Sequence, residues 1–183
     1  PEIMDAIICL TSCIDPQKTS AAIRTLHASG WTEADFKAIG TSQELYTQAL
    51  RIETEDLKGK LEVCTDSTDR ARIYERLAQI ESELDNISKA TKVASDTLLD
   101  MGMRSAAAAF AKAHSSATTA LAVVREIRAV VNERVVTVEA NLRSQVLNDS
   151  TKAETQVHLT ANVNKAFGAS NAETVQAELA EVR

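Results

Sequence analysis

The side chains that could do chemistry in this sequence are three cysteines, three histidines and two dense groups of carboxylates. Cys9 and Cys13 are four residues apart, so on a helix both thiols would lie on one face, where they could share a metal ion. The histidines fall in unrelated stretches, and a zinc site needs three or four ligands. We therefore interpret the cysteines as small buried hydrophobic residues in a reducing compartment, and we expect no metal site.

The carboxylates form two groups that could serve as acid–base or metal-binding pairs: Glu53, Glu55 and Asp56, and then Glu81, Glu83 and Asp85. Residues two apart on a helix do not face each other. A di-metal helical bundle needs Glu-x-x-His units, and no histidine here has an acidic residue three positions before it. The sequence also lacks a glycine-rich phosphate loop, a nucleophile elbow and a cofactor fingerprint. We expect a protein that is not an enzyme and that holds no cofactor.

Charge and hydropathy argue against a nucleic-acid partner and against a membrane-spanning helix. The formal net charge of the 183 residues is −6, and no third of the chain is net basic. Because nucleic-acid binding needs clustered Lys and Arg, we expect no nucleic-acid partner. No apolar run approaches the roughly 18 residues of a transmembrane helix, and the first residues lack the basic flank of a signal peptide. These features favour a soluble cytoplasmic protein, and Pro1 in place of an initiator Met favours a processed or excised segment.

The elements that position these groups are predicted to be helices. Five Gly, two Pro and 3% aromatic residues indicate few turns and a core with little bulk. Short helices are predicted over 2–14 and 17–29, with Thr32 as the N-cap of the next helix. From Ser42 a longer helix follows, with a break at 64–68. Its apolar face is predicted from Tyr46, Leu50, Leu57 and Leu61.

The strongest periodic signal is a heptad seam in which apolar residues alternate at steps of four and three. Its members are Ile73, Leu77, Ile80, Leu84, Ile87, Thr91, Ala94 and Leu98. Charges of both signs flank the seam, as on a solvated face. The pattern predicts one long helix packed on another helix, which belongs either to the same chain or to a second copy.

A helix of small residues is predicted next, after a break at 100–102. Gly102, Ala106, Ala109, Ala113, Ala117 and Ala120 form a smooth stripe that would let another backbone come close. Phe110 lies beside the stripe and is the one large side chain available to set the register. Leu121, Val124, Val131, Val135, Val138 and Leu142 continue one apolar face. If an interface between chains exists, we expect it at this stripe.

These patterns predict an all-α fold of long amphipathic helices in an elongated hairpin or bundle, with short C-terminal helices. We expect three regions: an N-terminal helical region at 1–65, a long helical core with the heptad seam at 66–148, and a C-terminal helical tail at 149–183. In the tail, Ser170 or Asn171 can cap a last helix that carries Val175, Leu179 and Val182 on one stripe.

From residue 70 onward the order of segments resembles the ESCRT-III family of membrane-remodelling filament proteins. The resemblance rests on Tyr74-Glu75 before the heptad seam, on Met101-Gly102-Met103 before the Ala106–Ala113 stretch, on the helix over 123–142, and on the Leu-acidic pattern of Glu173 to Glu181. It implies self-assembly into filaments, with the chain itself and a membrane surface as partners. The implied assembly interface is Ile73, Leu77, Ile80, Leu84, Ile87, Ala106, Ala109, Phe110 and Ala113.

The resemblance also implies that the tail recruits an AAA ATPase, through Val175, Leu179, Val182 and Arg183. Where the family has an internal Arg in this motif, the chain has Glu178. Residues 1–60 are net acidic, whereas the family's first helices are basic and bind acidic membranes. A peripheral membrane location would therefore have to rest on segments other than the first helices.

The alternative is a helical-bundle scaffold or adaptor of the talin or vinculin type, which binds partner proteins. Rods of that type are also rich in Ala, Ser, Thr and Val and poor in aromatic residues. This interpretation explains the composition equally well, but it does not explain a heptad seam followed by a glycine break and an acidic-apolar tail.

Overall fold

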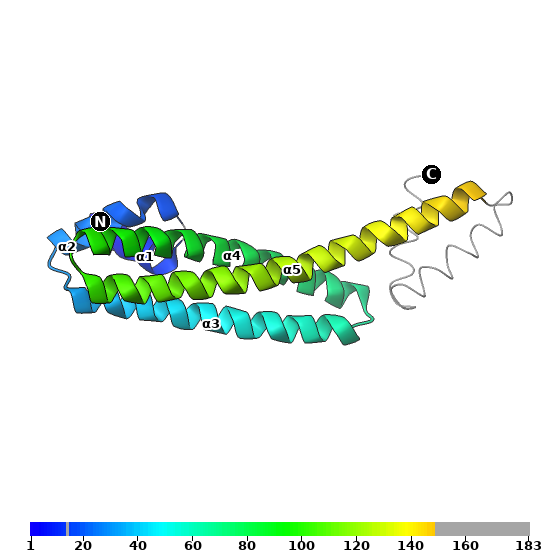
Figure 1. Cartoon of the computed structure of the whole chain (residues 1–183), viewed down its shortest axis with the longest axis horizontal. Coiled ribbons are helices and arrows are strands. Elements are labelled where there is room, and N and C mark those ends of the chain that lie inside the picture. The colour runs from blue at the N-terminus through cyan, green and yellow to red at the C-terminus, as the bar shows by residue number, and fades with distance from the viewer. Residues whose placement is uncertain (14, 149–183) are drawn as a thin grey trace. The chain divides into compact units, whose positions relative to one another are not determined.

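The computed structural model describes residues 1–13 and 15–148, and every regular element in that part of the chain is a helix (Figure 1). The elements are α1 (Glu2–Ser12), the 3₁₀ turn η1 (Pro16–Lys18), α2 (Thr19–Ala28), α3 (Glu33–Val63), α4 (Ser67–Asp100) and α5 (Arg104–Asn148). The predicted all-α class with long helices is confirmed. The short C-terminal helices predicted beyond residue 148 lie outside the described residues.

The start of α3 follows the predicted cap. The amide of Asp35 donates a hydrogen bond to Thr32 Oγ1 at 3.3 Å, and the amide of Thr32 donates to Asp35 Oδ2 at 2.8 Å. Each side chain thus satisfies an amide at the helix start that has no partner inside the helix. The Ser42 start of the longer pattern is not a helix start, because α3 runs without interruption from Glu33.

Two helices end in the same glycine motif. Gly102 has φ +78°, its amide donates to the Leu99 carbonyl, and the Met103 amide reaches back to the Leu98 carbonyl. Gly30, with φ +106°, ends α2 through the corresponding bonds of Gly30 and Trp31. A side chain would be strained at these backbone angles, so glycine marks both helix ends.

The chain forms two compact units whose boundaries cross the long helices. The first unit comprises 1–56 and 77–125, and the described part of the second comprises 57–76 and 126–148. Helices α3, α4 and α5 each contribute to both units. The expected regions at 1–65, 66–148 and 149–183 stay predictions.

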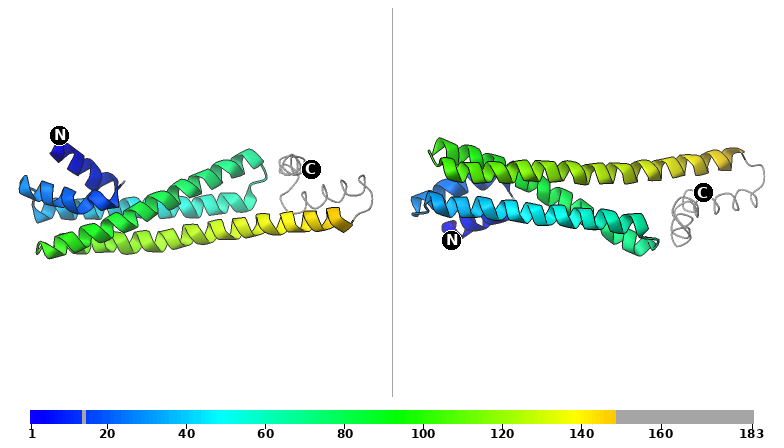
Figure 2. Two further views of the ribbon diagram at one scale, coloured as in Figure 1. Left: turned by 90° about the horizontal axis from the view of Figure 1, so that it is seen from above. Right: turned by 60° about the horizontal axis from the view of Figure 1, so that its bottom comes forward.

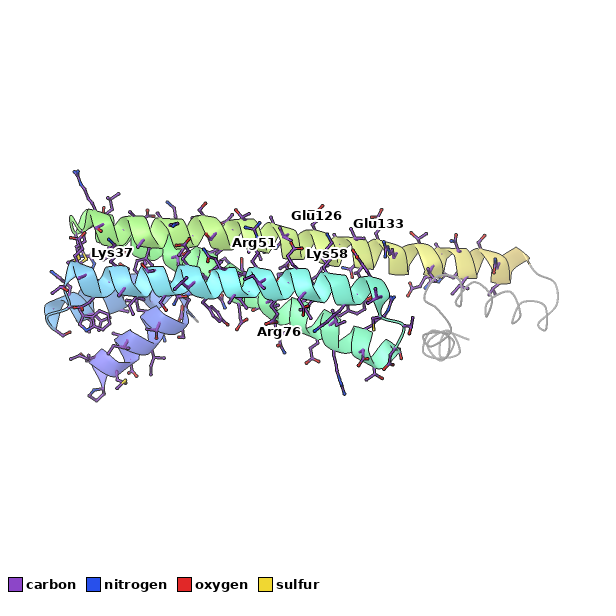
Figure 3. The ribbon with its side chains drawn as sticks, turned by 90° about the horizontal axis from the view of Figure 1, so that it is seen from below. Lys37, Arg51, Lys58, Arg76, Glu126 and Glu133 are labelled. Carbon is purple, nitrogen blue, oxygen red and sulfur yellow. The ribbon has the colours of Figure 1, made fainter. Side chains whose placement is uncertain are left out.

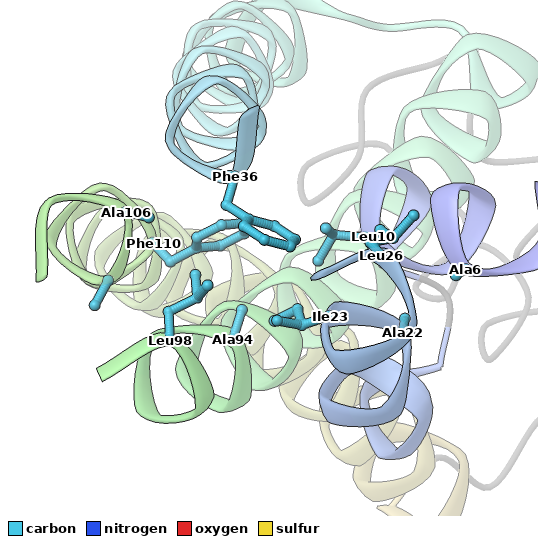
Figure 4. Close-up of a cluster of buried hydrophobic side chains, with 11 residues drawn as sticks. Ala6, Leu10, Ala22, Ile23, Leu26, Phe36, Ala94, Leu98, Ala106 and Phe110 are labelled. Carbon is cyan, nitrogen blue, oxygen red and sulfur yellow. The ribbon is translucent and has the colours of Figure 1, made fainter. Parts of the chain in front are cut away.

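The core of the first unit gathers five helices around small apolar side chains (Figure 4). Its members are Ala6, Leu10, Ala22, Ile23, Leu26, Phe36, Ala94, Leu98, Ala106, Ala107 and Phe110. The rings of Trp31 and Phe36 pack in a tilted arrangement, 5.5 Å between centroids. Phe36 and Phe110 are the fully enclosed aromatic rings of this core, and buried side chains of α1 and α2 complete it.

Within the first unit, α4 and α5 lie side by side after the Gly102 turn (Figure 2). Ser95 Oγ donates to the Ala107 carbonyl at 3.0 Å, and His114 Nδ1 lies 2.7 Å from the Ser88 carbonyl. Side chain to backbone bonds of this kind need two helix backbones close together, which the alanines permit. The Ala-rich stretch is thus the first part of the 45-residue helix α5, and it packs against other helices of its own chain.

Candidate partner-binding surface

Most of the predicted assembly residues lie in the interior of one chain. Leu77, Ile80 and Leu84 have no exposed surface, and Ile87 is 3% exposed. In the first unit these side chains face the other helices of the same molecule. An interface between chains at these positions stays a prediction, and it would require the unit to open.

The small-residue stripe is buried in the same way. Ala106, Phe110 and Ala113 are at most 1% exposed, and Ala109 is half-buried. A β-carbon added at Gly40 of α3 would lie 3.0 Å from the Ala109 Cβ and 3.0 Å from the Phe110 amide nitrogen. The stripe therefore meets α3 where α3 has no side chain, and Phe110 fills the adjacent core.

The remaining predicted site residues lie apart from these. Ile73 belongs to the second unit and borders an open hollow of about 390 Å³ near the turn from α3 to α4, together with Leu57 and Val63. The predicted ATPase-binding residues of the tail, Val175, Leu179, Val182 and Arg183, lie outside the described residues.

The thiols and carboxylates do not form a metal-binding group in the described part of the chain. No three His, Cys, Asp or Glu side chains there are grouped to hold a metal ion. Cys9 and Cys13 are free thiols, and burial raises the pKa of Cys13 to about 12, helped by the nearby Cys9. Burial also raises the pKa of Cys9. Both thiols are protonated at neutral pH, so neither is an activated nucleophile.

The described surface does carry an exposed apolar seam on α3. Its residues are Ala38, Ser42, Leu45, Ala49 and Ile52, at steps of four, three, four and three, and we call it the outer α3 seam. Leu45 is 61% exposed and Ile52 is 72% exposed. In Figure 3 α3 faces the reader, and no other described helix of the first unit lies in front of it. This heptad pattern has no partner within its unit.

The opposite side of α3 explains why sequence reasoning missed this seam. Seven buried positions follow heptad steps, namely Phe36, Gly40, Gln43, Thr47, Leu50, Thr54 and Leu57, and Glu44 beside them is buried as well. Several of these are small or polar, so hydropathy does not reveal the buried face. Tyr46, expected on that face, is 45% exposed, and its hydroxyl donates to Glu83 Oε1. The sequence does contain a signal for the outer α3 seam, which is its 4-3-4-3 spacing. Two alanines and one serine lower the hydropathy of the seam, so the spacing does not stand out.

A second exposed apolar group lies on α1. Ile3, Met4 and Ile8 are about half exposed, whereas Ala6 and Leu10 on the opposite side are buried in the core. We call these three residues the outer α1 face. Because α1 is apolar on both sides, one side can complete the core while the other remains available at the surface.

Comparison with known proteins found no matching family model, no matching curated protein and no matching solved structure. In the described range, no helix combines the length and the apolar character needed to cross a bilayer.

Proposed function

We propose that the chain is a helical-bundle scaffold or adaptor that works as a discrete particle and binds a partner protein. The observation that carries this proposal is the burial of the heptad seam within one chain: Leu77, Ile80 and Leu84 are fully enclosed. A seam already covered inside its own molecule does not need a second copy to cover it.

The energetics favour the closed form. Full burial of a Leu or Ile side chain is worth about 1.5–3 kcal/mol, so four seam residues together contribute several kcal/mol. The total stability of a domain is typically only about 5–15 kcal/mol. Opening the unit to use this seam for assembly would therefore cost a large share of its stability.

The outer α3 seam is the surface we assign to the partner. Heptad spacing fits another helix, because each apolar side chain can insert between residues of the facing helix. Ala38, Ser42 and Ala49 would let the two backbones approach closely, and Leu45 and Ile52 would supply the apolar contact. The partner is thus a protein that presents an amphipathic helix.

The second candidate function is self-assembly into filaments, with membrane remodelling as the resemblance implies. The same exposed seam supports it, since a second copy of the chain could also lie along α3. An AAA ATPase and a membrane surface as partners stay predictions, because the residues expected to recruit the ATPase lie beyond residue 148.

Negative-stain electron microscopy and analytical ultracentrifugation test the choice between the two. We expect one discrete species from about 1 to 100 µM, with and without acidic liposomes, because the strongest apolar seam is buried. Filaments, tubes or spirals would contradict the scaffold proposal.

If the chain does assemble, the variant Leu45→Asp tests whether the outer α3 seam is the interface. Leu45 is exposed, so the variant should keep the wild-type circular dichroism spectrum. If wild-type filaments form and Leu45→Asp abolishes them, the outer α3 seam is an interface between copies and the filament function replaces the scaffold.

A further inference from the structure

The outer α3 seam, which the proposed function assigns to a partner helix, runs through a stretch of α3 that is poor in charge. Between Lys37 and Arg51 the one charged residue of α3 is Glu44. Glu44 is buried, so the exposed surface of this helix over 38–50 carries no charged side chain. A partner helix can therefore lie along the seam without removing a charge of α3 from water.

Charged side chains instead follow one edge of the seam. Lys37, Glu44 and Arg51 are seven residues apart, so they lie on one side of α3. Helix α5 runs beside this edge, because Lys112 Nζ lies 3.6 Å from Glu44 Oε2. In Figure 3 the side chains of Lys37 and Arg51 lie along the α5 side of α3.

This edge is positive, because its one carboxylate is already paired. The Glu44 side chain is 12% exposed, whereas the Lys112 side chain is 73% exposed, so the cation of the pair is the part that faces solvent. Lys37 and Arg51 are exposed, and neither side chain forms an ion pair with another described residue. We call Lys37, Arg51 and Lys112 the cationic edge.

Helix α5 adds no acidic residue to balance these cations. Its part in the first unit, 104–125, contains Arg104, Lys112 and Arg125 but no Asp or Glu. The formal net charge of the whole chain is −6. The cationic edge is therefore a local excess of positive charge on an acidic protein.

The acidic residues of α3 lie at the two ends of the seam. Glu33 and Asp35 precede it, and they accept hydrogen bonds from the amides of Ser105 and Thr32 at helix starts. A second acidic group, at 53–56, follows the last seam residue. The middle of the seam, beside the cationic edge, is thus the part that favours a negatively charged partner.

The opposite edge of the seam lies toward α4 and differs in chemistry. Tyr46 is two residues after Glu44, so it lies on the other side of α3. There its hydroxyl donates to Glu83 Oε1 of α4 at 3.0 Å. Because the cations line only the α5 edge, a matching helix needs acidic residues along one flank.

We propose that the outer α3 seam binds an acidic amphipathic helix of a partner protein, with the acidic residues along the flank that meets the cationic edge. The apolar face of that helix packs on the seam. Its carboxylates pair with Lys37 and Arg51 and share Lys112 with Glu44. This inference rests on the scaffold function and names the chemistry of the partner.

The test compares three synthetic helices that share one apolar heptad face and differ only in the flanking residue, which is Glu, Gln or Lys. Each peptide has about 18 residues, enough to cover the seam, and a hydrocarbon staple on the far side holds it helical. Fluorescence anisotropy with the full chain measures binding. We expect the Glu peptide to bind about tenfold more tightly than the Lys peptide, and high salt to shrink this difference, because salt screens exposed charges.

The outcomes separate this inference from the scaffold function. Equal binding of the three peptides would overturn the acidic assignment and leave helix binding by the scaffold intact. Binding of none of them would overturn the inference and the assignment of a partner to this seam. The scaffold function itself fails on another readout, which is the formation of filaments by the chain without any peptide.

Charge reversal then locates the contact. Arg51→Glu should weaken binding of the Glu peptide about three- to tenfold and strengthen binding of the Lys peptide. The matched control is Arg24→Glu, an exposed residue of α2 with the same change in net charge, which should bind both peptides like the wild type. Both variants should keep the wild-type circular dichroism spectrum. Equal effects of the two variants would show that net charge governs binding, and they would overturn the proposal.

A membrane with acidic lipids is the other anionic surface that these cations could meet. The heptad spacing favours a helix, because the seam side chains insert between residues of a facing helix. Sedimentation with vesicles of phosphatidylserine and phosphatidylcholine makes the comparison, and we expect no binding that depends on Arg51. Vesicle binding that is lost in Arg51→Glu and kept in Arg24→Glu would assign the cationic edge to a membrane and overturn the proposal.

Discussion

The buried faces of α3 and α4 in the first unit are built from opposite kinds of residue. On α4 the enclosed positions are large and apolar, with Leu77, Ile80 and Leu84 at zero exposure. On α3 the enclosed positions include Gly40, and also Thr47, which is 1% exposed. Both faces follow heptad steps, but their side chains differ in size. The large side chains of α4 fill the core, whereas the small side chains of α3 let a neighbouring helix backbone approach closely.

The difference shows that burial does not require a hydrophobic residue when the backbone has a specific neighbour. Gly40 is buried because α5 passes within contact distance of its backbone. Gln43 is buried because its amide bonds the end of α1. Thr54 is buried because its hydroxyl donates to the Leu50 carbonyl of its own helix at 2.8 Å. For Gln43 and Thr54, a hydrogen-bond partner satisfies a polar side chain that hydropathy alone would place at the surface.

The largest effect is expected on the α4 face. Leu84→Ala should lower the free energy of unfolding by about 2–5 kcal/mol, because it removes enclosed methyl groups and leaves a cavity. Urea denaturation followed by circular dichroism measures the loss. Leu99→Ala is the control on the same helix, since Leu99 is 57% exposed, and it should cost under about 1 kcal/mol. Equal losses in the two variants would mean that the seam is not the core.

A smaller effect is expected at the closest approach of α3. Gly40→Ala should lower the free energy of unfolding by about 1–3 kcal/mol, because the new methyl group would meet the Ala109 Cβ and the Phe110 amide at 3.0 Å. Gly59→Ala lies on the same helix with nothing within 4 Å of the added carbon, and it should gain up to about 1 kcal/mol of stability. Thermal melts of both variants suffice. A stabilised Gly40→Ala would show that α5 does not approach α3 this closely.

The smallest effect concerns the polar residues of the same face. Thr47 Oγ1 is buried and has no hydrogen-bond partner among the described residues. Thr47→Val keeps the shape of the side chain and removes this hydroxyl, so it should raise the free energy of unfolding by about 1 kcal/mol. Thr54→Val is the matched control, and it should change stability by less than about 0.5 kcal/mol, because the Thr54 hydroxyl already has a partner. A destabilised Thr47→Val would indicate that this hydroxyl is bonded in solution.

Local signals predicted several of the helix ends. The Thr32 cap, the glycine ends at Gly30 and Gly102, and the break predicted at 64–68 and found at 64–66 depend on backbone angles and neighbouring side chains, which a short stretch of sequence specifies. The candidate partner-binding surface was not predicted from the sequence. The outer α3 seam has a heptad spacing in the sequence, but its alanines and serine give it little hydropathy, so only the tertiary structure shows that this face of α3 is exposed.

By itself, the sequence determined a helical protein with its principal breaks and the apolar seam of α4, because helix propensity, capping and periodic hydropathy act within a few turns. Only the tertiary structure decided what covers that seam, why Gly40, Gln43 and Thr47 are buried, and which face of α3 remains open. A heptad pattern requires a partner helix but does not say which one. Here the partner is supplied within the chain, because the small residues of α5 and the glycine of α3 let the three helices come together.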